Sequence, residues 1–251
     1  MNTILLRLVA PMQSWGTQSN FSIRDSGLEP SKSGVIGLIC AALGRPRDAS
    51  LEDLSSLRMG IRVDREGILR SDYQIAQNVL DSAGEKTKDS VPSTRYYLAD
   101  AAFLVGLEGS DITLFEQIQQ AMQAPAWALF LGRKAFPPSF PVWLPDGIRK
   151  DTSLEDALAV YPRIVAGVQG SFKRKPVIEK TEDSEPIENY RDQQEKLRFI
   201  IERADGEQIR SDVPISFAKR IFSSRRVKTL AKFVPYVFVQ EVEDVFVQTA
   251  A

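Results

Sequence analysis

Hydrophobic and polar positions in the first half of the chain follow strand-like and helix-like spacing in turn. The predicted strands are 3–9, 59–65, 95–107 and 126–132, and the predicted helices are 31–44, 50–57 and 110–123. Apart from the short helix at 50–57, the order is β, α, β, β, α, β, which is typical of ferredoxin-like domains. We therefore predict an α+β fold whose first domain, residues 1–135, is ferredoxin-like. RNA-recognition motifs share this fold.

The helix predicted at 31–44 has a start signal and a stop signal. Ser31 is a suitable N-cap, and Gly44 is a suitable C-terminal stop. Gly34 and Gly37 lower the helix propensity, but their lack of side chains permits a close approach to a sheet or a ligand. The helix at 110–123 has Ser110 or Asp111 as its predicted cap.

A long insertion separates the second and third predicted strands. Residues 68–77 read as an extended segment, whereas residues 78–94 are polar and contain Gly84 and Pro92. This pattern predicts an inserted β-hairpin at about 72–97, with the polar stretch as a loop or hairpin tip.

The second half of the chain is more irregular, and we predict a smaller, mainly β region over residues 136–251. A short helix is expected near 153–160, and a hairpin over 195–210 is expected to turn at Asp205-Gly206. The segment 227–243 reads as one or two further strands.

Charge is segregated within this second region. Residues 179–195 contain seven acidic and two basic residues, whereas residues 210–232 contain seven basic residues and one acidic residue. The acidic stretch has few apolar residues and is predicted to be an exposed loop. The basic stretch is interleaved with aromatic and aliphatic residues, which favours a structured surface.

The chain of 251 residues contains no histidine and a single cysteine, Cys40, and its net charge is −1. The absence of histidine excludes a serine–histidine triad, a histidine-ligated zinc and a histidine pair for RNA cleavage. Cys40 lies in an apolar helical pattern and is interpreted as a core residue. No apolar stretch approaches the length of a membrane span. We expect a cytoplasmic protein without metal or cofactor and without membrane contact.

Four segments carry side chains suited to binding RNA. They are the loop 10–16, the start of the helix after Arg24, the turn 131–138, and the basic segment 212–227. The helix start combines free N–H groups with a lysine and so suits a phosphate, and arginine beside aromatic residues suits a single strand. Each segment also has a simpler interpretation: a turn over a core tryptophan, helix capping, a solvated turn, and an amphipathic edge.

Taken together, these segments resemble the CasD family, the subunit of type I-E Cascade that caps the 5′ end of the CRISPR RNA. The matching stretches are "LRLVAPMQSWG" (6–16), "PSKSGVIGLICAALG" (30–44), "DYQIAQNV" (72–79), "RYYLADAAFLVGL" (95–107), "FLGRKAFP" (130–137) and "DVPISFAKRIFSSRRV" (212–227). The resemblance implies a non-catalytic CRISPR RNA-binding subunit that nucleates assembly of an antiviral complex. The segment 171–195 has no counterpart in the family and is interpreted as a solvated insertion rather than a loop facing another subunit.

The resemblance also implies partners and contacts. The insertion becomes a thumb that reaches along the RNA and abuts the Cascade backbone subunit, with the large subunit as a further partner and target DNA bound only through the complex. The residues expected to contact RNA are Gln13, Ser14, Arg24, Ser31, Lys32, Ser33, Tyr73, Arg95, Arg133, Lys134, Arg220 and Arg225. Trp15 is expected to pack beneath its loop.

Two other functions remain open. A related branch, from type I-C systems, cleaves precursor RNA with a tyrosine, a lysine and a histidine, and this chain cannot complete that set. A metal-independent endoribonuclease would instead use Tyr73 or Tyr97 with Lys32. The third possibility is an RNA-recognition module that acts outside any complex.

Overall fold

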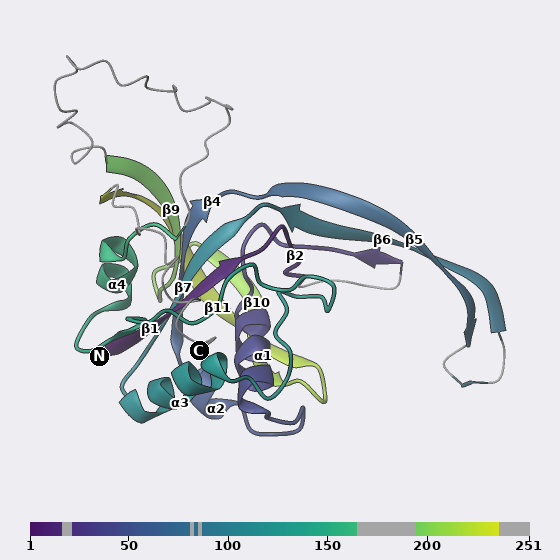
Figure 1. Ribbon diagram of the computed structural model, residues 1–251, viewed down its shortest axis with the longest axis horizontal. Helices are drawn as coiled ribbons and strands as arrows, with labels where there is room; N and C mark the ends of the chain where they lie inside the picture. The colour runs from purple at the N-terminus through teal and green to yellow at the C-terminus, as the bar shows by residue number, and fades with distance from the viewer. Residues whose placement is uncertain (17–21, 81–82, 85–86, 165–193, 236–251) are drawn as a thin grey trace, which may run out of the picture.

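A seven-stranded sheet forms the body of the molecule, and a long two-stranded hairpin projects from it (Figure 1). The computed structural model describes residues 1–16, 22–80, 83–84, 87–164 and 194–235. Of the acidic segment predicted at 179–195, only the last two residues fall within this part. The predicted strand segment 227–243 is described as far as residue 235.

Three central strands carry the apolar patterns seen in the sequence. β1 (Asn2–Val9), β7 (Ala102–Gly109) and β4 (Arg58–Arg65) pair antiparallel, and the short β8 (Ile148–Arg149) lies on the other side of β1. The strands predicted near 3–9 and 59–65 are thus confirmed.

The strand predicted at 126–132 is wrong. This apolar run is a loop, and the N–H groups of Ala126 and Trp127 donate to the carbonyls of Ala42 and Ala41 at 2.9 and 3.2 Å. The loop therefore caps the last turn of a helix instead of extending the sheet, and β8 takes the place beside β1.

Two helices cover one face of the sheet. α1 (Lys32–Leu43) and α3 (Ile112–Gln123) pack there, and the short α2 (Glu52–Ser55) follows α1. The Oγ of Ser31 accepts from the N–H of Gly34 at 3.2 Å, and Gly44 ends α1 with a φ of 70°. Both predicted caps are confirmed. Asp111, one of the two predicted caps of α3, accepts from two N–H groups of its first turn.

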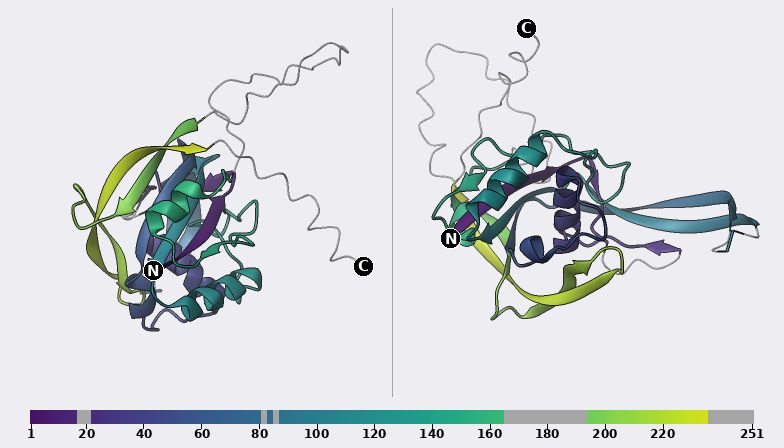
Figure 2. Two further views of the ribbon diagram at one scale, coloured as in Figure 1. Left: turned by 90° about the vertical axis from the view of Figure 1, so that its left-hand side faces the viewer. Right: turned by 90° about the horizontal axis from the view of Figure 1, so that it is seen from below.

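A second core lies on the opposite face. α4 (Leu154–Val160) begins after a Ser153 cap and packs Leu154 and Leu158 against Leu5 of β1 and Leu104 of β7. Because side chains along β1 alternate between the two faces, Ile4 and Leu6 join the core under α1 and α3. Figure 2 gives two further views of the sheet and of the helices that pack against it.

The C-terminal strands extend the same sheet, so both predicted regions contribute to it. β9 (Gln194–Glu202) pairs with β4, β11 (Ile221–Pro235) pairs with β9, and β10 (Gln208–Ser216) forms the edge. The hairpin predicted over 195–210 is wrong, because β11 lies between β9 and β10. A turn does occur at Asp205-Gly206. There the chain passes so close to β11 that a Cβ on Gly206 would lie 2.6 Å from the backbone nitrogen of Val227.

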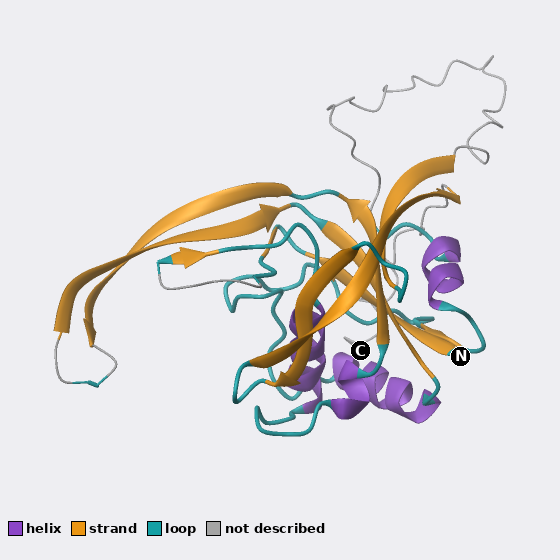
Figure 3. Cartoon of the chain, turned by 180° about the vertical axis from the view of Figure 1, so that it is seen from behind, coloured by secondary structure: helices purple, strands orange, loops and turns teal. Residues whose placement is uncertain are grey.

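The projecting hairpin, here called the thumb, is formed by β5 (Ile68–Leu80) and β6 (Thr87–Ala99). It is longer than the predicted 72–97, and its two strands curve together away from the body (Figure 3). The long strand predicted at 95–107 is interrupted at Asp100, whose φ of 58° turns the chain from β6 into β7. Two short strands, β2 (Met12–Gln13) and β3 (Ile23–Arg24), pair with the base of β6.

The predicted α+β class is confirmed: the molecule is mostly sheet, curled and antiparallel, with few helices. No helix in the described ranges combines the length and the apolar content needed to span a bilayer.

Candidate nucleic-acid interface

Three arginines predicted to contact RNA come together at the base of the thumb, and we call them the arginine cluster: Arg24, Arg95 and Arg133. Arg24 on β3 is the parallel register partner of Arg95 on β6. The Nη2 of Arg133 donates to the carbonyl of Tyr96 at 2.9 Å and to that of Arg24 at 3.3 Å. Three cationic side chains from separate parts of the chain therefore share one surface.

The cluster concentrates positive charge. Burial lowers the pKa of Arg133, and the charges of Arg95 and Arg24 lower it further, while Asp25 and Asp72 act in the opposite sense. The guanidinium stays charged at any physiological pH. Within the described ranges, no carboxylate lies within 4.0 Å of any of the three guanidinium groups. An anion placed here would relieve the mutual repulsion.

The turn that carries Arg133 is fixed by close backbone packing. Gly132 has a φ of 91°, and a Cβ at this position would lie 1.7 Å from the carbonyl oxygen of Ser14. Ser14 in turn donates its N–H to the carbonyl of Leu131 at 3.1 Å and its hydroxyl to that of Tyr96 at 3.2 Å. The Ser14 backbone therefore packs directly against Gly132.

The opening loop, residues 10–16, is fixed beside this turn by buried hydrogen bonds. Gln13 is fully buried, and its Nε2 donates to the carbonyls of Leu8 and Ala101 at 3.2 and 2.8 Å. Trp15 is 2% exposed and donates its indole N–H to the Oε1 of Gln13 at 3.1 Å. The packing predicted for Trp15 is confirmed. Gln13 and Ser14, predicted to contact RNA, instead hold the loop against strands β1 and β6, because their polar atoms bond to backbone groups.

The predicted phosphate position at the start of α1 is occupied by a carboxylate of the chain itself. Asp212 Oδ2 accepts the N–H of Lys32 at 2.8 Å, and the Oγ of Ser31 is engaged as the N-cap. The Nζ of Lys32 bonds to Glu202 at 3.1 Å, and the side chain is 2% exposed. Ser33 is half-buried and donates to Ser31. Because Asp212 of the same chain neutralises the start of α1, Ser31 and Lys32 have structural roles here.

Arg225 completes this buried group. Its guanidinium forms two bonds with Asp212, at 2.7 and 2.9 Å, and a third with Glu202 at 3.4 Å. We call Lys32, Glu202, Asp212 and Arg225 the buried ion network. Burial opposes ionisation of Asp212, but the bonds from Arg225 and from the Lys32 N–H hold its pKa below the usual range. Burial lowers the pKa of Lys32, and Glu202 counteracts this shift. Arg225, predicted to contact RNA, is thus a structural residue in this state.

The remaining predicted residues lie on the surface. Tyr73 is 65% exposed on β5, and Lys134 follows Arg133 on the exposed turn. Arg220 is exposed at the turn between β10 and β11, with a φ of 54°. Of these, Lys134 directly follows Arg133 of the arginine cluster, whereas Arg220 lies in a different part of the sequence, just before β11.

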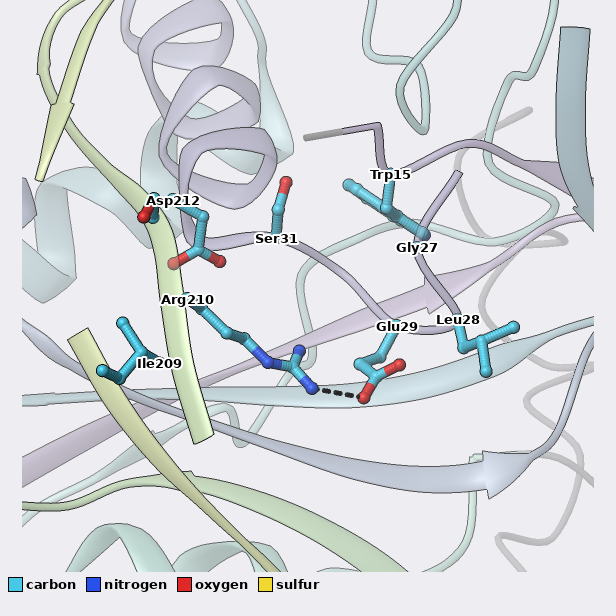
Figure 4. A pocket seen from close by; sticks show the side chains of 9 residues that line it. Trp15, Gly27, Leu28, Glu29, Ser31, Ile209, Arg210 and Asp212 are labelled. Atoms are coloured by element: carbon cyan, nitrogen blue, oxygen red, sulfur yellow. Dashed lines mark hydrogen bonds and ion pairs between the residues drawn. The ribbon is translucent and has the colours of Figure 1, made fainter. Parts of the chain in front are cut away.

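A pocket that sequence reasoning missed opens between the segment before α1 and the edge strand β10 (Figure 4). Its volume is about 330 Å³, and its lining residues are Trp15, Gly27, Leu28, Glu29, Ser31, Ile209, Arg210, Ser211 and Asp212. Arg210 reaches across it to Glu29, with Nη2 and Oε1 separated by 2.7 Å. No local pattern indicates this pair, because 181 positions separate the two residues.

The chain is similar to CRISPR-associated proteins in three comparisons. A family model described as CRISPR-associated protein (Cas_Cas5) matches residues 3–228. The Cascade subunit CasD of Escherichia coli (strain K12) is 31% identical over 157 aligned positions, and the alignment covers 56% of this chain and 69% of that protein.

Two solved structures are similar over nearly their whole length. A Cas protein crystal structure has 37% identity and a TM-score of 0.66, and the match covers 93% of this chain and 95% of that one. A chain of a CRISPR RNA-guided surveillance complex has 30% identity and a TM-score of 0.71, with coverage of 93% and 91%.

Proposed function

The chain belongs to the Cas5 family of CRISPR-associated proteins, and from this premise we propose that it is a non-catalytic, CRISPR RNA-binding subunit of a type I-E Cascade complex. It caps the 5′ handle of the guide RNA and nucleates assembly of the complex for antiviral DNA targeting. The similarity to CasD and to a chain of an RNA-guided surveillance complex supports this role.

The observation that carries the proposal is the arginine cluster. Arg24, Arg95 and Arg133 present three guanidinium groups at the base of the thumb, the first two on paired strands and the third on a closely packed turn. Guanidinium groups bind phosphate through paired N–H donors, and phosphate contacts set the position of a bound nucleic acid. Lys134, Tyr73 and Arg220 remain proposed contacts because their side chains are exposed.

The shape and exposure of the thumb are suited to contact with both the RNA and a neighbouring subunit. Both strands extend away from the body, and Tyr73 and Ile75 are exposed on β5. We assign it to the guide RNA and to the Cascade backbone subunit; the large subunit completes the set of partners, and target DNA is engaged only through the complex. A subunit in this setting is cytoplasmic.

We also propose that the core is ferredoxin-like. The strand order β4-β7-β1-β8 and the connections through α1 and α3 support this assignment. β8 then takes the place of the fourth strand, and the thumb is an insertion between the second and third.

The non-catalytic assignment is supported by the position of Lys32. The endoribonuclease alternative requires this lysine beside Tyr73 or Tyr97, but its ammonium is buried against Glu202. Tyr97 packs near Phe136, with ring centroids 5.9 Å apart. With purified protein and repeat RNA we expect no cleavage, and cleavage that Lys32→Ala abolishes would overturn this assignment.

Assembly tests the main proposal. The wild-type chain, co-expressed with the other Cascade subunits and a guide RNA, is expected to co-purify with both in size-exclusion chromatography. The double variant Arg24→Gln/Arg95→Gln is expected to lose guide RNA. A matched control, Arg203→Gln/Lys228→Gln, removes two cations that pair with Asp205 outside the arginine cluster and should assemble normally. Equal RNA retention in both variants would show that the arginine cluster is not part of the RNA interface.

A further inference from the structure

The pocket between the segment before α1 and β10, here called the Glu29 pocket, has a chemistry different from that of the arginine cluster. Glu29 and Asp212 contribute carboxylates to its lining, and Arg210 contributes the guanidinium (Figure 4). Asp212 is already bonded to Arg225 and to the Lys32 N–H. The group positioned to receive a ligand is therefore the Glu29–Arg210 pair.

The hydrogen bonds of Glu29 are concentrated on one oxygen. Its Oε1 accepts from Arg198 at 3.2 Å and from Arg210 at 2.7 Å. Neither bond uses Oε2, and a carboxylate has about four acceptor sites. Glu29 thus keeps acceptor capacity on Oε2, while Arg210 retains N–H donors beyond the one that Glu29 uses.

The charge of the pocket determines which part of a nucleotide it suits. The arginines beside Glu29, Arg198 and Arg210, are already paired with its carboxylate, so phosphate binds more favourably at the three cations of the arginine cluster. A base is uncharged and carries N–H donors at its edge, so it suits an acceptor-lined pocket. Leu28 and Ile209 are 54% and 64% exposed at the pocket, and their aliphatic side chains offer apolar surface to the faces of a ring. The volume is at the lower end of ordinary small-ligand pockets, which begin near 300 Å³.

The segment that carries Arg24 leads directly to residues that line the pocket. Leu28 lies four residues after Arg24, so the two Cα atoms are at most about 14 Å apart. Gly27 donates its N–H to the carbonyl of Trp15 at 2.9 Å, which fixes the connecting segment to the same loop that supports Arg133. A single strand whose phosphates lie on the cluster thus reaches the pocket with a neighbouring base.

We propose, on the basis of the function proposed above, that the Glu29 pocket holds one unstacked guanine of the bound RNA. Guanine presents two adjacent donors, N1–H and the N2 amino group, which can share the unused Oε2 of Glu29, and an O6 acceptor that matches Arg210. Adenine and cytosine each place a ring-nitrogen acceptor beside their amino group, and uracil has one N–H between two carbonyls. Each of these three leaves an acceptor facing Glu29.

The test uses short oligouridine RNAs that carry a single central G, A or C, together with the all-uridine strand, and measures affinity by fluorescence anisotropy. The wild-type protein is expected to bind the G-containing RNA roughly tenfold more tightly than the others. Glu29→Gln is expected to remove this preference without weakening binding of the all-uridine strand. The matched control is Glu66→Gln, because Glu66 also pairs with Arg198 but does not line the pocket; it should keep the preference.

The outcomes separate this inference from the proposed function. Failure of the wild-type protein to bind any of the RNAs would overturn both. Binding that depends on Arg24 and Arg95 but shows no preference for G, or a preference that survives Glu29→Gln, would overturn the guanine pocket alone. If Glu29→Gln does not fold, Ile209→Trp, at an exposed position, fills the mouth and must also remove the preference. A Glu29→Gln protein that keeps the G preference but loses a Cascade subunit would assign the pocket to a cationic side chain of that subunit and overturn the inference.

Discussion

Replacing Asp212 by asparagine should destabilise the protein strongly, because this side chain joins two parts of the molecule. Its carboxylate is 2% exposed and accepts from the guanidinium of Arg225 on β11 and from the first N–H of α1. The buried ion network contains two cations and two anions, so Asp212→Asn leaves one positive charge in excess. Arg225 is only 3% exposed and cannot turn to water to compensate.

Breaking a buried ion pair by removing one partner costs about 3–5 kcal/mol. For a protein of this size, each kcal/mol lowers the melting temperature by roughly 2–4 °C. The expected decrease for Asp212→Asn is therefore about 6–20 °C. The carbonyl of asparagine can still accept from the Lys32 N–H, so the lost charge accounts for most of the effect.

Urea denaturation at neutral pH measures the change in the free energy of unfolding directly. The matched control is Asp205→Asn, since Asp205 also bonds to a strand-borne cation, Lys228 at 3.2 Å, but lies on the surface. Its expected loss of stability is small, because solvent screens an ion pair on the surface. A loss below about 1 kcal/mol for Asp212→Asn would refute the inference that the network ties α1 to the C-terminal strands.

The same group sets a direction for the pH dependence. The pKa of Asp212 in the folded protein lies below its unfolded value, because Arg225 and the Lys32 N–H outweigh the opposing effect of burial. Stability from this group is therefore present above about pH 4 and is lost as the pH falls through the folded pKa. Asp212→Asn should make acid unfolding less steep in that range.

Two further substitutions test the supports of the site. Gly132→Ala should weaken RNA binding and stability together, because a Cβ would lie 1.7 Å from the Ser14 carbonyl oxygen at a φ of 91°; unchanged thermal unfolding and affinity would contradict the close packing of this turn. Ser31→Ala should lower the free energy of unfolding by about 1 kcal/mol, since its Oγ caps α1, and should leave the affinity for RNA unaltered; a weaker affinity in the folded variant would return Ser31 to the RNA interface.

Features set by neighbouring residues were predictable from the sequence. The Ser31 cap, the Gly44 stop and the central strands follow from local patterns, and the structure contains them. Trp15 was also placed correctly, because an aromatic residue beside a strand end usually joins the core. The family resemblance added what local patterns lack, and the comparisons confirm it.

Features set by distant residues were not predictable. The start of α1 has the residues of a phosphate site, but Asp212, 180 positions away, fills it. The turn at Asp205-Gly206 is real, yet its strands do not pair because β11 lies between them. Likewise, the apolar run at 126–132 looks like a strand until its N–H groups are seen to cap α1. In each case the local chemistry is present and a partner from elsewhere determines its role.

The salt dependence of affinity for the 5′ handle tests most directly whether the chain holds guide RNA through the arginine cluster. For single strands, the slope of log affinity against log salt is about −0.7 per phosphate contact. We expect Arg24→Gln/Arg95→Gln to make the slope shallower by more than one unit, and we expect Lys32→Met, within the buried ion network, to leave it unchanged. An unchanged slope in the double variant, or a shallower slope for Lys32→Met in a protein that remains folded, would contradict the proposed RNA interface.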